Sequence, residues 1–348
     1  MAGQVQVAKK LTAAKVDLII FTGSSEKGRL IAAAASKNLT PCILELGGKC
    51  PVVVDSSADI EFAATKVSLN AFMNSGQTCI RPDYCLVQYE LVNSFMEQLQ
   101  KQMKLMYDKD KNFIGRVVNQ FHTNRLCKLL ADHKGTVTIG NAAAHEDGKL
   151  IPTVVLNPAE DCAMMNEEIF GPILGVFTYK NLDEAIKLIN SKPKALAVYY
   201  FGTNSNKNVN LNKLMRETSS GAFCVNEMCF QMYNPDLPFG GVGEAGNGRL
   251  HGKNGFDGCS NLKSVLRKAP LKFYPFNIMT PPFTADKQGM IRMLAGRLNY
   301  TQSALAKRTI WLLVLLWLLW LVVTRRLTVQ TFKRFWQMLK MMWAFMRR

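Results

Sequence analysis

The sequence lacks the patterns that mark disulfide scaffolds and metal sites. Its nine cysteines are scattered, odd in number and never spaced C-x-x-C, which argues against a disulfide framework or a zinc ribbon and favours a reducing compartment. The four histidines, at positions 122, 133, 145 and 251, show no ligand spacing, so we predict no metal site. Residues 1–15 are polar and basic without an apolar stretch, which predicts that no cleavable signal peptide is present.

Acidic residues are missing from the C-terminal part of the chain. Residues 287–348 contain twelve Lys and Arg but no Asp or Glu, so they carry twelve of the seventeen net positive charges. The same part contains residues 310–323, which are all Ile, Trp, Leu or Val. Basic residues flank this apolar run and three tryptophans lie within it, as is typical of a membrane segment. The distribution of charge therefore disfavours nucleic acid as a partner.

The apolar run is short, because a straight helix needs roughly 20 apolar residues to cross a bilayer. After it, apolar residues recur at helical spacing between residues 327 and 346 with Lys and Arg between them, which predicts a basic amphipathic helix. We therefore predict that residues 306–348 attach to membrane lipid, either spanning it or lying on it. The rest of the chain would face the cytoplasm, and the endoplasmic reticulum is one suitable membrane. The alternatives are a buried core helix and an exposed helix that binds nucleic acid.

Residues 16–217 alternate between short apolar segments and helical segments. Continuously apolar strands separated by helices are typical of an α/β fold with a largely parallel sheet. Residues 22–25 resemble a turn, and Ser57 or Asp59 is the expected cap of the helix that runs towards Asn74. The predicted strands are residues 16–21, 41–46, 51–54, 173–179 and 195–201, and the other predicted helices are residues 26–37, 182–189 and 206–217.

A glycine motif lies between the first predicted strand and helix. Gly23-Ser-Ser-Glu-Lys-Gly28 has the spacing G-x-x-x-x-G, and backbone N–H groups at the start of a helix can hold a pyrophosphate. A P-loop nucleotidase would require Lys and then Ser or Thr at the next positions, where this chain has Arg29 and Leu30. The motif therefore indicates either a dinucleotide site of another class or a plain turn.

Further motifs follow in a fixed order: Leu44-Glu-Leu-Gly-Gly-Lys49, Phe72-Met-Asn-Ser-Gly-Gln-Thr-Cys-Ile-Arg-Pro-Asp-Tyr84, Asn166-Glu-Glu-Ile-Phe-Gly-Pro172, Leu237-Pro-Phe-Gly-Gly-Val-Gly243, His251-Gly-Lys253 and Phe256-Asp257. With these motifs the sequence resembles the aldehyde dehydrogenases over roughly residues 10–268. It is most similar to their class 3 branch, which includes the membrane-anchored fatty aldehyde dehydrogenases.

The resemblance implies roles for individual residues. Cys79 matches the nucleophile, whose thiolate attacks the aldehyde and gives a thiohemiacetal and then a thioester. Glu45 matches the general base that activates the hydrolytic water. Phe239 and Gly240 match a segment that returns to line the site. The implied cofactor is NAD, with NADP as the alternative, and the residues implied to bind it are Gly23, Ser24, Gly28, Leu46, Glu168 and Phe170.

The resemblance also implies the domain organisation. The chain begins just before the strand that leads to Gly23, so we expect an incomplete dinucleotide-binding sheet, an α/β catalytic domain and a membrane-associating helical tail. The sheet would then leave an exposed edge, which tends to pair or aggregate. The predicted divisions are a remnant of the NAD-binding domain at 1–45, a catalytic domain at 46–232, a return segment at 233–268, a linker at 269–305 and the tail at 306–348.

Three functions are compatible with these residues. The leading hypothesis is NAD(P)-dependent oxidation of long-chain or lipid-derived aldehydes to carboxylic acids. A second is a catalytically silent, membrane-bound binding partner of longer relatives. A third is a cofactor-independent esterase, which needs only Cys79 and Glu45. The expected partners are a small aldehyde, membrane lipid and a further copy of the chain, and the cysteines at positions 42, 50, 127 and 162 are interpreted as inert.

Overall fold

The computed structural model describes residues 5–107, 115–140, 148–267 and 277–295, together with residues 312 and 316. The chain divides into two units, Met1–Leu262 and Lys263–Arg348. The predicted tail at 306–348 lies outside the described residues, apart from positions 312 and 316. Within the described part of the chain, no helix combines the length and the apolar character needed to span a bilayer.

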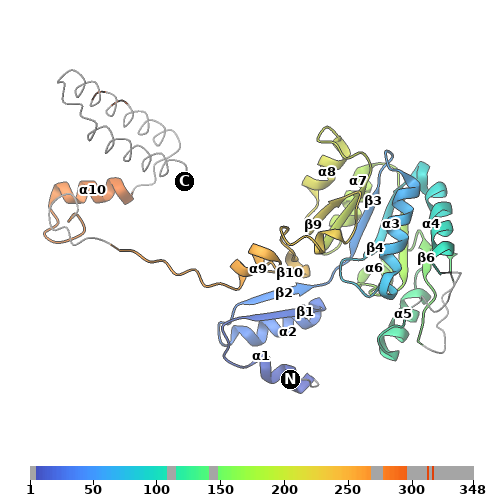
Figure 1. Ribbon diagram of the computed structural model, residues 1–348, viewed down its shortest axis with the longest axis horizontal. Coiled ribbons are helices and arrows are strands. Elements are labelled where there is room, and N and C mark those ends of the chain that lie inside the picture. Colours follow the sequence, from blue (N-terminus) through green and yellow to red (C-terminus); the bar gives the residue numbers. More distant parts are fainter. Residues whose placement is uncertain are drawn as a thin grey trace. The chain divides into compact units, whose positions relative to one another are not determined.

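The first unit is built from alternating strands and helices (Figure 1), which confirms the predicted α/β class. Its strands are β1 (Ile19–Gly23), β2 (Cys42–Leu46), β3 (Cys50–Val54), β4 (Pro82–Gln88), β5 (Thr136–Ile139), β6 (Thr153–Leu156), β7 (Ile173–Tyr179), β8 (Ala195–Phe201), β9 (Ser220–Val225) and β10 (Gly246–Asn247). Its α-helices are α1 (Val5–Thr12), α2 (Ser25–Ser36), α3 (Ile60–Phe72), α4 (Val92–Tyr107), α5 (Gln120–Ala131), α6 (Ala163–Asn166), α7 (Leu182–Asn190), α8 (Val209–Glu217) and α9 (Gly252–Gly258). Short 3₁₀ helices are η1 (Met73–Gly76), η2 (Tyr89–Leu91), η4 (Phe230–Met232) and η5 (Gly243–Ala245), and the second unit contributes α10 (Ala285–Ala295).

The larger sheet has seven strands in the order β5-β6-β7-β4-β3-β8-β9. Its neighbouring strands pair in parallel, apart from the antiparallel pair β5 and β6. Side chains alternate along β3, so Val53 belongs to one core cluster while Val52 and Val54 belong to the other. One cluster contains residues of α3 and α4, and the other contains residues of α7 and α8. Helices on both faces explain why these strands are continuously apolar.

The smaller sheet has three strands in the order β1-β2-β10. Strands β1 and β2 are parallel, and α2 connects them; β10 joins the other side of β2 in antiparallel orientation. Gly28 allows α2 to approach the sheet, because a Cβ at this position would lie 2.7 Å from the methyl groups of Leu46. Within the described residues β1 forms the outer edge of this sheet, and Ile20 on it is 51% exposed.

The structure corrects the predicted start of α2. Residues 22–25 are not a separate turn, because β1 continues through Thr22 and Gly23, which pair with Glu45 and Leu46 of β2. Ser24 then caps the helix, and its side-chain oxygen accepts a hydrogen bond from the backbone N–H of Lys27 at 3.4 Å. The parallel pairing with β2 therefore keeps Gly23 in the strand, and the helix begins directly at Ser25.

The other predicted boundaries agree more closely with the structure. The strands predicted at 173–179 and 195–201 are confirmed as β7 and β8. Asp59 is the cap of α3, since its carboxylate accepts from the N–H of Phe62 at 3.0 Å. This helix ends at Phe72 rather than near Asn74, because Asn74 adopts a left-handed conformation with φ of 55°.

Candidate active site

Cys79 follows a sharp reversal of the chain at the end of α3. Asn74, Ser75 and Gly76 have φ values of 55°, 53° and 67°, which lie outside the range of a right-handed α-helix and prevent α3 from continuing. Gly76 must lack a side chain, because a Cβ would lie 2.1 Å from the carbonyl oxygen of Gly171. The chain passes from this reversal into β4, and Cys79 remains only partly buried between them. The reversal therefore presents the thiol at the end of the larger sheet.

Gln77 fastens this loop to the neighbouring chain. Its side-chain amide donates to the carbonyl oxygens of Asn74 at 3.1 Å and Arg116 at 3.0 Å. Its side-chain oxygen accepts the backbone N–H of Val118 at 2.9 Å. One side chain thus joins the two segments, and a fixed loop limits the directions in which the thiol of Cys79 can point.

Glu45 lies on β2, the central strand of the smaller sheet, and is only 5% exposed. Neither of its carboxylate oxygens has a hydrogen-bond partner among the described residues. Burial raises the pKa of Glu45 to about 7, and the positive charge of Arg249 opposes this rise. An unpaired buried carboxylate destabilises a fold. Its presence, together with a pKa near neutrality, therefore marks Glu45 as a candidate proton acceptor.

Both predicted carboxylates affect the pKa of the Cys79 thiol. Burial raises the pKa of the Cys79 thiol, and the negative charges of Glu168 and, more weakly, Glu45 raise it further. Hydrogen bonds from the backbone N–H groups of Cys79 and Ile80 to the sulfur act in the opposite direction. Both predicted carboxylates therefore act on the predicted nucleophile, and two backbone donors stabilise negative charge on its sulfur.

Glu168 packs directly on the main chain of the link between β2 and β3. A Cβ at Gly47 would lie 2.0 Å from Oε2 of Glu168, so this position must be glycine. The carboxylate accepts a hydrogen bond from the N–H of Gly48, which lowers its pKa, but its Oε1 is buried without a hydrogen-bond partner among the described residues. Burial and the charge of Asp83 prevail and raise the pKa of Glu168 to about 7.

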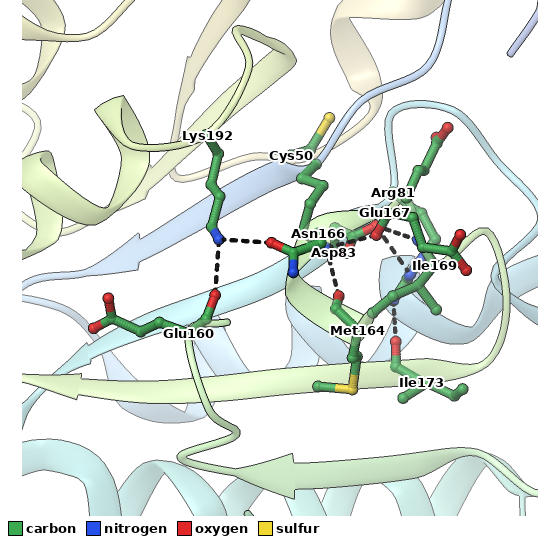
Figure 2. Close-up of polar contacts among 12 residues, drawn as sticks. Cys50, Arg81, Asp83, Glu160, Met164, Asn166, Glu167, Ile169, Ile173 and Lys192 are labelled. Atoms are coloured by element: carbon green, nitrogen blue, oxygen red, sulfur yellow. Dashed lines mark hydrogen bonds and ion pairs between the residues drawn. The ribbon is translucent and has the colours of Figure 1, made fainter. Parts of the chain in front are cut away.

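A buried ion pair holds the segment that carries Glu168. Nζ of Lys49 lies 2.5 Å from a carboxylate oxygen of Asp83, and both side chains are almost fully buried. Lys49 also donates to the carbonyl oxygens of Met164 at 2.8 Å and Glu167 at 3.1 Å. The other carboxylate oxygen of Asp83 accepts the N–H of Ile169 at 2.9 Å. Figure 2 shows Asp83 among Met164, Glu167 and Ile169.

Two arginines complete this frame. Arg81 donates from Nη2 to the carbonyl oxygen of Ile173 at 2.6 Å, and its Nη1 lies 3.9 Å from Asp83 (Figure 2). Arg125, on α5, donates to the carbonyl oxygens of Glu168 at 3.1 Å and Ile169 at 2.6 Å. The backbone on both sides of Glu168 is therefore fixed by charged groups. Sequence reasoning did not single out this frame, although charged residues beside or within apolar strands were a visible signal.

The residues predicted to bind the cofactor form a β1-α2-β2 unit. Gly23 and Leu46, at the carboxyl ends of β1 and β2, are paired residues of the parallel ladder. Ser24 is the N-cap of α2, the helix that connects the two strands. Helix N-termini placed after a strand suit phosphate groups. The unpartnered Oε1 of Glu168 is an acceptor of the kind a ribose hydroxyl requires. These groups fit a dinucleotide, and their individual roles stay predictions.

Phe239 and Phe170, both implied in the site by the sequence motifs, belong to segments that lie far apart in the sequence. Phe239 exchanges backbone hydrogen bonds with Leu250, and its ring stacks on His251 with centroids 5.0 Å apart. Phe239 and Cys79 both pack against the core cluster that contains α3 and α4 residues. Phe170, predicted to contact the cofactor, follows Ile169 with a φ of 45° and is 39% exposed.

Arg249 is a site residue that sequence reasoning did not identify. Its guanidinium donates to the carbonyl oxygens of Gly241 and Gly248, both at 2.6 Å. A Cβ at Gly240 would lie 3.0 Å from the Arg249 side chain and 3.1 Å from Oε1 of Glu45. The glycines of this segment therefore let a cation approach the buried carboxylate. No group of three or more potential metal ligands was found in the described part of the chain.

Comparison with known proteins adds independent findings. The family model for the aldehyde dehydrogenase family matches residues 2–265. The chain is 37% identical over 270 residues to 4,4'-diaponeurosporen-aldehyde dehydrogenase of Staphylococcus aureus, a match that covers 77% of this chain and 58% of that protein. It is 39% identical over 267 residues to the mouse protein named aldehyde dehydrogenase, dimeric NADP-preferring, covering 76% of this chain and 58% of the relative.

A solved structure gives the same result. The substrate-bound state of Staphylococcus aureus AldH superimposes with a TM-score of 0.77 at 36% sequence identity, covering 84% of this chain and 64% of that chain. The chain thus spans about three fifths of the length of the curated relatives described above. The similarity includes every motif from which the candidate site is built, since the family match extends over residues 2–265.

Proposed function

The chain belongs to the aldehyde dehydrogenase family, and we propose that the site around Cys79 and Glu45 oxidises aldehydes to carboxylic acids with NAD or NADP. The observation that carries this proposal is the carboxylate of Glu45. It is buried, it has no hydrogen-bond partner among the described residues, its pKa lies at about 7, and it acts electrostatically on Cys79. A base of this pKa beside a nucleophilic sulfur suits hydrolysis of a thioester at neutral pH.

The residues of the chain account for the covalent steps. The thiolate of Cys79 forms a bond to the carbonyl carbon of the aldehyde, and the carbonyl oxygen takes up the negative charge. NAD or NADP, when bound, would supply the acceptor for the hydride that leaves this carbon, and Cys79 would then hold the acyl group as a thioester. Glu45 then accepts a proton from water, whose oxygen attacks the thioester. The carbon–sulfur bond breaks, the carboxylic acid leaves and the thiolate is restored.

We also propose long-chain or lipid-derived aldehydes as substrates and a membrane as the location. The support is in the sequence, where residues 306–348 combine an uninterrupted apolar run with flanking and following basic residues. Attachment would place the site on the cytoplasmic side, for example at the endoplasmic reticulum, where apolar aldehydes can reach it from the bilayer. The relative named dimeric supports a homo-oligomer for this chain.

Formation of reduced cofactor tests the enzymatic proposal. The full chain is mixed with NAD or NADP and a long-chain aldehyde, and the absorbance of reduced cofactor is followed. We expect Cys79→Ser to abolish the reaction, while Cys259→Ser, which alters an exposed thiol, leaves it unchanged. Equal activity in Cys79→Ser would refute the assignment. A chain that neither binds nor reduces cofactor would favour the silent binding partner.

Two further measurements separate the remaining alternatives. Hydrolysis of an activated ester without cofactor, lost in Cys79→Ser and Glu45→Gln, would show that the two residues suffice for esterase chemistry. Flotation of the full chain with vesicles of neutral or anionic lipid tests the membrane proposal. We expect stronger binding to anionic vesicles, because the tail carries only basic charges. Failure to float with either kind of vesicle would contradict attachment.

A further inference from the structure

Buried side chains donate to the two backbone carbonyls at the nucleophile. The thiol of Cys50 lies 3.6 Å from the carbonyl oxygen of Cys79 and donates to it. The hydroxyl of Tyr199 donates to the carbonyl oxygen of Ile80 at 2.7 Å, and the thiol of Cys229 approaches the same oxygen at 3.6 Å. All three donor residues are buried. The backbone on which the nucleophile sits is thus held from the interior of the protein.

The donors themselves are fixed by the larger sheet. Cys50 lies on β3, and its sulfur accepts the backbone N–H of Ala197, on β8, at 3.3 Å. Tyr199 lies on β8, and its hydroxyl accepts a hydrogen bond from the side-chain amide of Gln231 at 3.1 Å. Strands β3 and β8 are hydrogen-bonded neighbours. The pairing of β3 with β8 therefore fixes the positions of both donors.

The geometry of the peptide bond transmits this constraint to the sulfur. The carbonyl of Cys79 and the N–H of Ile80 belong to one planar trans peptide group, so fixing the direction of the oxygen also fixes the direction of the N–H. The Cα that carries the thiol lies in the same plane, and the nearby N–H of Ile80 lowers the pKa of the Cys79 thiol. The bond from Tyr199 fixes the next peptide group and thereby limits rotation at Ile80.

We propose that Cys50 and Tyr199 are positioning residues that hold the two peptide groups after Cys79 in one orientation and thereby fix the directions of its thiol and of the Ile80 N–H. The inference rests on the proposed function only in taking Cys79 as the nucleophile. Among the described residues the hydrogen bonds of these side chains go to the carbonyls and not to the sulfur, so each acts through the peptide group it holds. A preorganised N–H donor stabilises charge without reorganisation during the reaction, so losing either contact lowers the thiolate fraction and slows attack.

A purely structural role is the competing explanation, and the chain contains a matched control for it. The hydroxyl of Tyr179 is also buried and also donates to a strand carbonyl, that of Val54, at 3.1 Å. Tyr179→Phe therefore removes the same kind of hydrogen bond as Tyr199→Phe, but from a carbonyl that is not next to Cys79. Tyr199→Phe also removes the hydrogen bond from Gln231 and should lose somewhat more stability, but it alone should change the behaviour of the Cys79 thiol.

Alkylation of Cys79 by iodoacetamide measures that behaviour without aldehyde or cofactor. The full chain is treated over a range of pH, and modification of the Cys79 peptide is quantified by mass spectrometry. We expect Tyr199→Phe to shift the pH profile upwards and to slow alkylation roughly tenfold at neutral pH. Tyr179→Phe should leave the profile as in the wild type. Cys50→Ser, which keeps a donor, should react almost normally, whereas Cys50→Ala should resemble Tyr199→Phe.

These experiments decide whether Cys50 and Tyr199 position the backbone at Cys79 or only stabilise the fold. Their results do not depend on whether the chain oxidises aldehydes. Identical Cys79 profiles for Tyr199→Phe and Tyr179→Phe would overturn the proposal, even if the enzyme proves fully active. Equal reactivity of Cys50→Ser and Cys50→Ala would overturn it as well, and this comparison remains available should Tyr199→Phe fail to fold. A shifted profile in a chain that reduces no cofactor would support the positioning role and refute dehydrogenase activity.

Discussion

Replacing Glu45 by Gln should stabilise the protein relative to the wild type, and this difference in stability should grow as the pH rises. Glu45 is buried, and its carboxylate has no hydrogen-bond partner among the described residues. Ionisation of this group is therefore opposed by the fold, which raises the pKa from its ordinary value of 4.5 to about 7. Gln has nearly the same shape but no charge, so the variant never requires a carboxylate to ionise inside the protein.

The magnitude follows from the linkage between protonation and stability. A carboxyl group with a higher pKa in the folded state lowers the free energy of unfolding as pH rises through the window between the two pKa values. For Glu45 that window extends from 4.5 to about 7. The loss is small at about pH 5 and reaches about 3 kcal/mol at about pH 8. A buried Gln amide without partners adds a penalty that does not depend on pH.

Urea denaturation of both proteins at several pH values tests this reasoning. The free energy of unfolding of Glu45→Gln relative to the wild type should increase by about 2–3 kcal/mol between about pH 5 and pH 8. The control is Glu97→Gln, which removes an exposed carboxylate of α4 and reports the general effect of losing one negative charge. A difference between Glu45→Gln and the wild type that is independent of pH would show that the fold does not oppose ionisation of Glu45.

Three further predictions concern the same site. Because Glu45 acts as a base only when ionised, the rate of ester or thioester hydrolysis should rise as the pH passes through about 7, and a flat pH–rate profile would contradict its role. Asp83→Asn leaves the buried ammonium of Lys49 without its carboxylate, so the free energy of unfolding should fall by about 3–5 kcal/mol; an unchanged urea midpoint would disprove the importance of the pair. Gly28→Ala places a methyl group 2.7 Å from the side chain of Leu46, so the free energy of unfolding should fall by about 1–3 kcal/mol. A midpoint temperature of thermal unfolding equal to that of the wild type would argue against this close packing.

The long strands β7 and β8 of the larger sheet could be predicted from the sequence, whereas its central strand β4, its edge strand β5 and the short β10 of the smaller sheet were not. β7 and β8 are mostly apolar and almost entirely buried, and such runs identify strands that are covered on both faces. β5 alternates between exposed and half-buried residues over four positions, and β10 has only two residues. β10 exists because its backbone pairs with β2, and no local pattern encodes such a partner.

The residues of the candidate site also differ in how well the sequence predicts them. Glu45 could be predicted because a carboxylate within an apolar strand is conspicuous, and Cys79 because its loop carries a recognisable motif. The charged residues around Glu168 were visible in the sequence, but their partners could not be predicted, since Lys49 bonds to residues 34 and 115 positions along the chain. The approach of Arg249 to Glu45 depends in the same way on the folded path of the glycine segment. Contacts at such separations follow from topology rather than from periodicity.

The short stretch from Glu45 to Cys50 explains why these features occur together. It links β2 of the smaller sheet to β3 of the larger one, and it supplies the candidate base, the glycine beneath Glu168, the cation of the buried ion pair and the thiol that holds the Cys79 carbonyl. Burial raises the pKa of both Glu45 and Glu168 to about 7. The same packing that orders the link therefore opposes ionisation of its carboxylates. A change that let water reach Glu45 would lower its pKa and with it the basicity on which hydrolysis depends.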